Sequence, residues 1–307
     1  MLRSLLLRAA DSQRLRGMVE AAPPTRAVVR RFIAGDTIAD GLQAAQRLAE
    51  DGLVASIDVL GEDVTDPAQA EQATQAYLEL LAGVPQAGLV GSLDVSLKLT
   101  SLGAALPGGT EAAYSNARRI CEAAVMVGAT VTVDAEDHTT LDRMHGVVDQ
   151  LREDFPTVGL VLQAMLHRTP ADAVRYAGPA SRVRLCKGAY DEPAEAALRG
   201  RAEVSAAYVA AARTLFAGQG YPMLATHDPE LIAAAEVLAG ESGRRPGDYE
   251  FQMLFGIRTD EQRRLARTGH RVRVYVPCGT DWWGYFVRRL AERPANLLFF
   301  LRALVGR

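Results

Sequence analysis

Basic and aromatic residues near the C-terminus are the part of this sequence best suited to chemistry. An apolar segment ends at Tyr275, and on the helix expected after it Tyr285, Arg288, Arg289 and Glu292 stand three or four residues apart. Residues at that spacing share one face of a helix. Because arginine grips a carboxylate with two parallel hydrogen bonds, this face is suited to clamping a small anion. A solvated helix face with ion pairs inside the helix is the alternative interpretation.

The elements that must position this helix follow a regular rhythm. The expected strands are residues 53–59, 93–99, 130–134, 159–163, 183–187, 223–226, 250–253 and 272–276. The expected helices are 67–82, 111–127, 140–155, 170–177, 194–219, 228–238, 259–267 and 282–305. Eight strands, each followed by a helix, predict an α/β fold of the (βα)8 TIM-barrel type. The strand segments are nearly continuously apolar, as is typical of parallel strands covered on both faces.

A doubly wound α/β sheet is the rival fold. Such a sheet usually carries a glycine-rich turn after its first strand, and neither GxGxxG nor GxxxxGK[ST] occurs here. Residues 1–45 are rich in arginine, alanine and leucine and are interrupted at Pro23-Pro24. We therefore expect extra N-terminal helices in residues 1–45 and a barrel domain in residues 46–307.

Composition narrows the class of protein. The chain has 307 residues, of which 49% are hydrophobic, and a formal net charge of −3. That balance gives no sign of nucleic-acid binding. Three widely spaced cysteines without a CxxC pair argue against a disulfide framework or a zinc site and fit a reducing compartment. No run approaches the roughly 20 apolar residues that cross a membrane.

Polar side chains gather where the expected strands end, which is the active-site end of a TIM barrel. They are Asp58, Lys98, Asp134, Glu136, Gln163, Arg184, Lys187, Thr226, His227, Gln252 and Tyr275. Charged groups at the end of an apolar barrel are costly unless they are paired or functional. With Arg288 and Arg289 added, the basic residues Lys98, Arg184 and Lys187 outnumber the acids Asp134, Glu136 and Glu292. That balance suits a ligand with several anionic groups, such as a phosphorylated cofactor together with a carboxylate substrate.

Each of these residues also has a structural interpretation. Lys98 suits a buried ion pair, and Thr226–Asp228 suits the N-cap of a helix. Asp134 and Glu136 suit capping as well, and with His138 they resemble a metal cluster. No HExxH motif or second nearby histidine accompanies them, so we expect no metal.

Eight segments, taken together and in order, resemble the proline dehydrogenase family. They are Ser96-Leu97-Lys98-Leu99, Asp134-Ala135-Glu136, Val161-Leu162-Gln163-Ala164, Arg184-Leu185-Cys186-Lys187-Gly188-Ala189-Tyr190, Ala225-Thr226-His227, Glu250-Phe251-Gln252-Met253-Leu254, Arg273-Val274-Tyr275-Val276-Pro277 and Tyr285-Phe286-Val287-Arg288-Arg289-Leu290. The length resembles that of the stand-alone enzymes rather than the bifunctional fusions. The resemblance implies a distorted (βα)8 barrel, in agreement with the rhythm of the sequence.

For the substrate, the resemblance implies that Lys98, Arg288 and Arg289 bind the carboxylate of L-proline. The residues implied to wall the pyrrolidine ring are Leu185, Tyr190, Tyr275 and Tyr285. Asp134 would orient the basic and phenolic groups beside the substrate. The hydroxyl of Tyr275 would also crowd a substituted ring, which favours proline over hydroxyproline.

For the cofactor, the resemblance implies FAD. Arg184 would lie near flavin N5, where hydride from the ring carbon arrives, and Gln163 would hydrogen-bond the pyrimidine edge. The other residues implied at the cofactor are Ala135, Lys187, Gly188, Ala189, Thr226 and His227. The product would be 1-pyrroline-5-carboxylate, and the electrons would pass to a membrane quinone. That route implies a cytoplasmic enzyme with peripheral contact at the inner membrane face.

Two rival functions remain open from the sequence. A Schiff-base lyase would use Lys187 or Lys98 as its nucleophile. A barrel repurposed as a non-enzymatic scaffold would bind no flavin and would be indifferent to substitution of Lys98 or Arg288. Fold alone distinguishes none of these.

Overall fold

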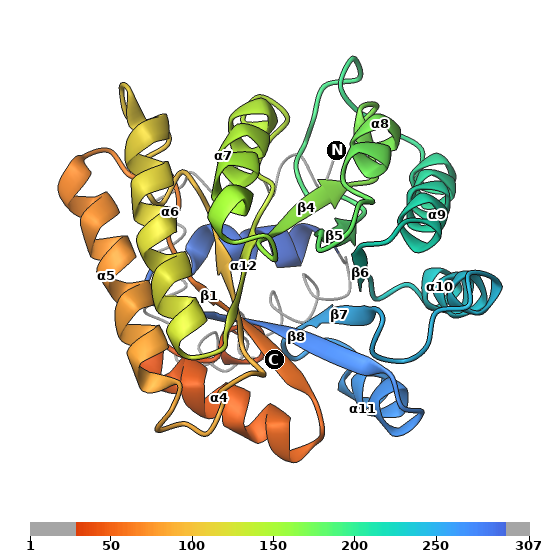
Figure 1. Cartoon of the computed structure of the whole chain (residues 1–307), viewed down its shortest axis with the longest axis horizontal. Coiled ribbons are helices and arrows are strands. Elements are labelled where there is room, and N and C mark those ends of the chain that lie inside the picture. Colours follow the sequence, from red (N-terminus) through yellow and green to blue (C-terminus); the bar gives the residue numbers. More distant parts are fainter. Residues whose placement is uncertain (1–28, 293–307) are drawn as a thin grey trace, which may run out of the picture.

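Residues 29–292 are described by the computed structural model, and they contain a closed barrel of eight parallel strands (Figure 1). Each strand pairs with the next in chain order, and β1 pairs with β8 to close the ring. The strands are β1 Val54–Val59, β2 Asp94–Leu97, β3 Thr130–Val133, β4 Gly159–Gln163, β5 Arg182–Cys186, β6 Tyr221–Ala225, β7 Glu250–Leu254 and β8 Arg271–Cys278. The TIM barrel predicted from the sequence is confirmed.

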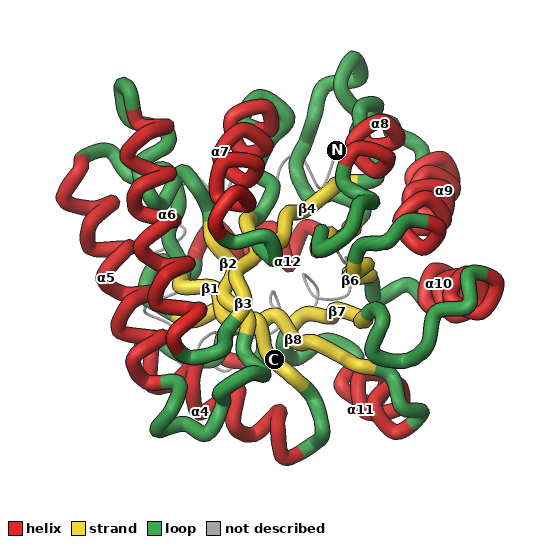
Figure 2. The backbone as a smooth tube through the Cα atoms, viewed as in Figure 1, coloured by secondary structure: helices red, strands yellow, loops and turns green. Residues whose placement is uncertain are grey.

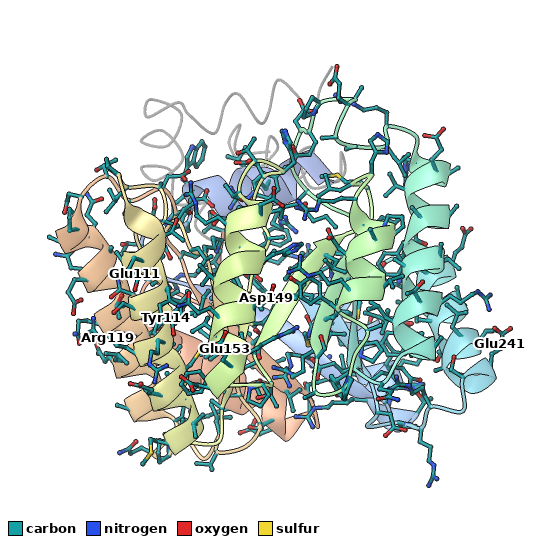
Figure 3. All side chains as sticks on the ribbon, turned by 45° about the horizontal axis from the view of Figure 1, so that its top comes forward. Glu111, Tyr114, Arg119, Asp149, Glu153 and Glu241 are labelled. Carbon is teal, nitrogen blue, oxygen red and sulfur yellow. The ribbon has the colours of Figure 1, made fainter. Side chains whose placement is uncertain are left out.

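Helices surround the strands as an outer ring, except for the last one, α12, which lies at the centre of the view (Figure 2). They are α4 Ile38–Glu50, α5 Pro67–Gly83, α6 Gly109–Met126, α7 Leu141–Asp154, α8 Thr169–Arg175, α9 Arg201–Ala217, α10 Pro229–Glu241, α11 Thr259–Arg267 and α12 Trp283–Glu292. None of the helices in residues 29–292 is both long and apolar enough to cross a bilayer. Surface ion pairs join neighbouring helices, such as Arg119 to Glu71 at 2.7 Å and Arg213 to Glu241 at 2.9 Å. Figure 3 shows Arg119 and Glu241 on the outer side of the ring.

Where both ends are described, the expected helices match those of the structure to within three residues, with one exception. The expected helix 194–219 begins only at Arg201, because residues 187–200 form a loop that is held to the barrel by a bridge between Leu166 and Ala197. Helix α12 begins one residue late, and its expected continuation to residue 305 lies outside the described residues. Helix α4 runs across residue 45. The division of the chain at that point stays a prediction, because residues 1–28 are not described.

The apolar core lies between the strands and the helices. Alternate strand residues face outward and most of them are buried there, for example Ile57 on β1, Val95 on β2 and Val274 on β8. Helix residues such as Leu80 and Leu81 of α5 complete the same core. Burial of this apolar surface is the main favourable contribution to folding.

The barrel interior, in contrast, is polar. The alternate positions of most strands carry Ser56 and Asp58, Asp94 and Ser96, Thr130 and Thr132, Arg182 and Arg184, Glu250 and Gln252, and Arg273. The expectation of nearly continuous apolar strands is therefore wrong for their inward faces. These groups are tolerated in the interior because they hydrogen-bond one another from strand to strand, as Ser56 does with Asp94 at 2.7 Å.

Helix α12 lies across the C-terminal end of the barrel. Helix α12 lies behind the strands in the view of Figure 1. In the turned view of Figure 3 it lies across the upper end of the barrel. Its apolar residues Trp283, Phe286 and Val287 form a second cluster with Phe32 and Leu60. This packing holds the basic end of α12 above the strands.

Candidate active site

Asp134 stands at the centre of the polar residues at the C-terminal end of the barrel. Its Oδ1 accepts a hydrogen bond from Arg184 Nη1 at 2.5 Å, and its Oδ2 accepts one from the Tyr275 hydroxyl at 2.7 Å. Strands β3, β5 and β8 thus meet at one carboxylate. Burial raises the pKa of Asp134, against the opposing effect of the charges of Arg184 and Lys98.

Arg184 is buried and fully engaged. Its Nε donates to Gln252 at 2.5 Å, and Nη1 donates to Ser96 at 2.9 Å as well as to Asp134. Its Nη2 donates more weakly to Ser56 at 3.3 Å and Asp94 at 3.4 Å. The guanidinium also lies 5.4 Å from the centre of the Tyr275 ring. Any further acceptor for Arg184 must replace one of these contacts.

Lys98 forms a two-pronged ion pair with Asp58. Its Nζ lies 2.8 Å from Oδ1 and 2.7 Å from Oδ2. Burial lowers the pKa of Lys98, but the charges of Asp58, Asp134 and Glu62 outweigh it, so the pKa is raised above its usual value. The residue therefore stays protonated, whereas a Schiff-base nucleophile must be a free amine. The geometry does not favour Lys98 as the lysine of a lyase.

Arg288, which we expect at the substrate carboxylate, has a partner that the sequence did not indicate. Its Nη1 and Nη2 lie 2.7 and 2.9 Å from the two carboxylate oxygens of Glu62, in the loop after β1. The pair contradicts the interpretation of Arg288 as part of a solvated helix face. Burial raises the pKa of Glu62, but the Arg288 hydrogen bonds and charge more than offset it, so the pKa is lowered. The side chain of Glu292, which was expected on the same helix face as Arg288, is not among those that the structure describes.

Two tyrosines form a stacked pair beside these charges. The rings of Tyr275 and Tyr285 lie 6.4 Å apart and only 7° from parallel. Arg289 lies 5.2 Å from the centre of the Tyr285 ring, and Arg288 lies 6.0 Å from that of Tyr190. Aromatic faces and guanidiniums expected at the substrate are thus close together, although they come from β8, α12 and the loop after β5.

Leu185 does not belong to this group. Arg182 and Arg184 face the barrel interior, so alternation turns Leu185 to the opposite side of β5. Its side chain has no exposed surface and packs in the core between strands and helices. The expectation that Leu185 walls the substrate is therefore wrong.

Leu254 is the apolar residue that the sequence analysis missed. It follows Glu250 and Gln252 in the inward phase of β7, pairs in register with Tyr275, and is partly exposed. The period-two pattern of β7 could have identified it, because the buried polar residues mark which phase faces inward.

The residues expected at a cofactor lie at the ends of β3 to β6. The Gln163 amide donates to the Glu136 carbonyl at 2.8 Å, which fixes the amide orientation. Lys187 pairs with Asp228 at 2.8 Å. Gly188 has φ +107°, and a Cβ there would lie 2.5 Å from Met165 Sδ. Only glycine suits that backbone without strain.

Thr226 and His227 fix the connection between β6 and α10. The Thr226 hydroxyl accepts from the Asp228 amide at 3.1 Å, and Asp228 caps α10 by accepting from the Glu230 amide. His227 Nε2 accepts from the Leu254 amide at 2.9 Å. The N-cap interpretation is thus right for Asp228, and the ring of His227 joins two strand ends.

The acids of the supposed metal cluster have separate partners. Glu136 accepts from the hydroxyl and amide of Thr100, and His138 pairs with Glu192, whereas Asp134 binds Arg184 and Tyr275. Burial raises the pKa of Glu136 to about 7, against the effect of its hydrogen bonds from Thr100. Within residues 29–292 no group of acids, histidines or cysteines is arranged to hold a metal ion.

The fold and this site define a TIM-barrel protein with buried charges and stacked tyrosines at the C-terminal end of the strands. The chain belongs to the proline dehydrogenase family, whose sequence model matches residues 41–302. Proline dehydrogenase 1 of Bacillus subtilis is 36% identical over 281 residues, covering 92% of each chain. Proline dehydrogenase of Deinococcus radiodurans is 35% identical over 283 residues, covering 91% of this chain and 90% of the relative.

A solved structure supports the fold. Proline utilization A (PutA) from Bdellovibrio bacteriovorus, inactivated by N-propargylglycine, matches with a TM-score of 0.79 and 23% identity. The match covers 87% of this chain but only 32% of that protein. This chain therefore corresponds to about a third of that longer protein, whereas the Bacillus and Deinococcus relatives match it over 92% and 90% of their own lengths.

Proposed function

We propose that the protein oxidises L-proline to 1-pyrroline-5-carboxylate with FAD as hydride acceptor. The observation that carries this proposal is the grouping of Arg288 and Arg289 beside the stacked Tyr275 and Tyr285, in a member of the proline dehydrogenase family. Paired guanidiniums suit a carboxylate, and parallel aromatic faces suit a small saturated ring.

Arg288 and Arg289 bind the proline carboxylate in this proposal, and Lys98 adds a third positive charge. Arg288 is held by Glu62, so the substrate carboxylate takes the place of the Glu62 carboxylate as its two-pronged partner. Exchanging one carboxylate for another keeps the guanidinium paired, which limits the cost of desolvation. Holding the acid group at one end fixes the orientation of the reacting C–H bond.

Tyr275, Tyr285 and Tyr190 wall the ring, and Leu254 takes the apolar place first expected for Leu185. Asp134 orients the Tyr275 hydroxyl by accepting its hydrogen bond, and it holds Arg184 at the same time. A rigid wall of this kind excludes water from the reacting carbon and rejects bulkier rings.

The residues at the ends of β3 to β6 fit a flavin nucleotide. Because Gln163 donates its amide N–H to Glu136, its Oε1 is left to accept a hydrogen bond from a pyrimidine edge. Lys187 supplies a cation for the phosphates, and Thr226 and His227 serve the adenylate end. Ala135, Gly188 and Ala189 line the ring, where Gly188 allows close approach of the backbone. Bound FAD supplies the hydride-accepting N5, beside which we place Arg184.

The electrons leave to a membrane quinone in this proposal. Such an acceptor requires the protein, which we place in the cytoplasm, to contact the inner face of the membrane peripherally. Incubation with liposomes that contain a quinone tests this step, since proline should then reduce the quinone. Failure of quinone reduction, with an artificial acceptor still reduced, would reject the quinone alone.

The central experiment uses the colour of the purified protein. We expect a flavin spectrum that is bleached by L-proline without oxygen and is restored by air. In Arg288→Met the yellow colour should persist but bleaching should require much more proline, whereas the surface variant Arg213→Met should match the parent. A colourless protein that borohydride traps covalently with a carbonyl substrate would instead indicate the lyase, with Lys187 as its remaining candidate nucleophile.

A further inference from the structure

A cavity of about 560 Å³ opens at the opposite end of the barrel, where the strands begin. We call it the basal cavity. It is lined by Gly91, Leu93, Thr130, Thr157, Ala180, Arg182, Gln219, Gly220, Tyr221, Arg244, Gly247, Asp248, Glu250, Arg271 and Arg273. Arg182 begins β5, so the cavity lies about 13 Å along that strand from its C-terminal end, at 3.3 Å per residue. It is separate from the proposed proline site.

The lining of the basal cavity is rich in positive charge. Four arginines face two acids, Asp248 and Glu250. Two of those arginines direct their hydrogen bonds to acceptors within the protein. Arg273 forms a two-pronged pair with Glu250 at 2.7 and 3.2 Å and also donates to backbone carbonyls. Arg244 donates to four backbone carbonyls that surround it.

Arg182 is different, because its buried guanidinium has few good acceptors. The residue is only 8% exposed. Among the described residues it donates to Asp94 at 3.2 Å and to the thioether of Met223 at 3.5 Å. Asp94 already accepts shorter bonds from Thr130 at 2.6 Å and Ser56 at 2.7 Å. A guanidinium has five N–H donors, so these two contacts leave Arg182, which lines the cavity, with donors for a further acceptor.

Arg271 is the second arginine in the lining with N–H donors for a further acceptor. Its one ion pair in the described part of the chain is with Glu250 at 3.4 Å, and Glu250 is already gripped by Arg273.

We propose that the basal cavity binds a small oxyanion with two negative charges, held between Arg182 and Arg271. Planar guanidiniums match the paired oxygens of phosphate and carboxylate. The ligand would neutralise the excess charge and supply the acceptors that Arg182 lacks. Inorganic phosphate and a dicarboxylate such as succinate share this chemistry, and the experiment separates them.

Calorimetric titration of the FAD-loaded protein tests the proposal at constant ionic strength and without oxygen. Excess proline is present, so that the flavin stays reduced and the cations at the other end are occupied. Phosphate and succinate are titrated in parallel, with chloride as the monovalent control. We expect saturable binding of at least one dianion and none of chloride. Arg271→Gln should weaken that binding roughly tenfold, because it removes one charge-assisted pair. The exposed variant Arg213→Gln should bind like the parent.

Each outcome decides the proposal. Binding of phosphate alone or of succinate alone identifies the source of the oxyanion. Absence of saturable binding by both, or equal affinity in Arg271→Gln and the parent, overturns it. Arg182→Gln is expected to abolish binding. Because that buried variant is at risk of misfolding, the decisive comparison is between the parent and Arg271→Gln, whose substituted side chain is 41% exposed in the parent.

Discussion

Tyr275 donates a hydrogen bond of 2.7 Å to Asp134, whose other oxygen is held by Arg184. Tyr275→Phe keeps the ring beside Tyr285 but removes both that hydrogen bond and the hydroxyl. We expect kcat/KM for proline to fall roughly tenfold, as loss of one hydrogen bond to a charged group does. The ratio of activity on hydroxyproline to activity on proline should rise, because the crowding hydroxyl is gone.

Tyr114→Phe is the matched control for this change, since Tyr114 lies on the outer helix α6 (Figure 3). Both substrates should be unaffected in it. A Tyr275→Phe enzyme with an unchanged substrate ratio would show that this hydroxyl does not select the ring.

Substitution of Arg288 tests the carboxylate clamp. Arg288→Met should weaken proline binding by on the order of 2–5 kcal/mol, because it leaves the buried carboxylate of proline without its arginine partner. FAD content, measured from the ratio of flavin to protein absorbance, should stay at the level of the parent. Arg213→Met controls for the loss of an arginine on the surface. Equal proline affinity in all three proteins would remove Arg288 from the clamp.

Asp58 is predicted to keep Lys98 charged. In the parent the charge of Asp58 raises the pKa of Lys98 against burial, which alone would lower it. Asp58→Asn removes the opposing charge, so Lys98 should lose its proton at a lower pH. The KM for proline in Asp58→Asn should then rise relative to the parent as the pH is raised from about 7 to about 9.5, toward the ordinary pKa of a lysine. Parallel profiles for the two proteins would mean that Lys98 does not contribute its charge to the substrate.

Glu136 makes stability depend on pH. Burial raises its folded pKa from 4.5 to about 7, so between these values the folded protein keeps a proton that the unfolded chain has lost. Its contribution to the free energy of unfolding therefore falls as the pH rises through this window, by about 3 kcal/mol in total. Glu136→Gln should lack that fall when urea unfolding is compared below and above the window, at about pH 5 and about pH 8. An identical pH dependence in both proteins would contradict the shift.

Two of the three cysteines should be inert in the native protein. Burial raises the pKa of Cys121 and of Cys278 to about 12, so very little thiolate is present near neutral pH. Cys186 is only partly buried. Titration with a coloured disulfide reagent should therefore modify at most Cys186 until denaturant is added. Rapid modification of Cys278 would indicate that β8 separates from α4, where a Cβ on Gly41 would lie only 2.8 Å from the Cys278 sulfur.

The order of the elements could be predicted from the sequence because the spacing of apolar segments depends on local patterns. The phase of each strand was harder to assign. Leu185 and Leu254 both lie near strand ends beside functional motifs, yet only the alternation with buried Arg184 or Gln252 shows which one faces inward. A resemblance to a family assigns a residue type to a position. Which alternate residues of a strand face the barrel interior has to be worked out for each strand separately.

Long-range partners were not predictable in the same way. Glu62 lies in a loop 226 residues before Arg288, and no local pattern marks it as the partner of that arginine. Asp94 was likewise missed, because it begins a strand, whereas functional residues are expected at strand ends. The barrel closes β1 against β8 and so brings residues from the two halves of the sequence together. Such pairs depend on the order in which the strands pair around the closed barrel, and local sequence patterns do not reveal them.

Asp94 touches Arg182 below it and Arg184 above it, so one carboxylate links the two ends of the barrel. An effort to graft the residues proposed to bind proline onto a different eight-stranded scaffold would therefore fall short if it copied the loops and α12 alone. The graft would have to include Asp94 as well, because without it the buried Arg184 would keep Asp134 as a counter-ion but lose the second one, on the side of Arg182.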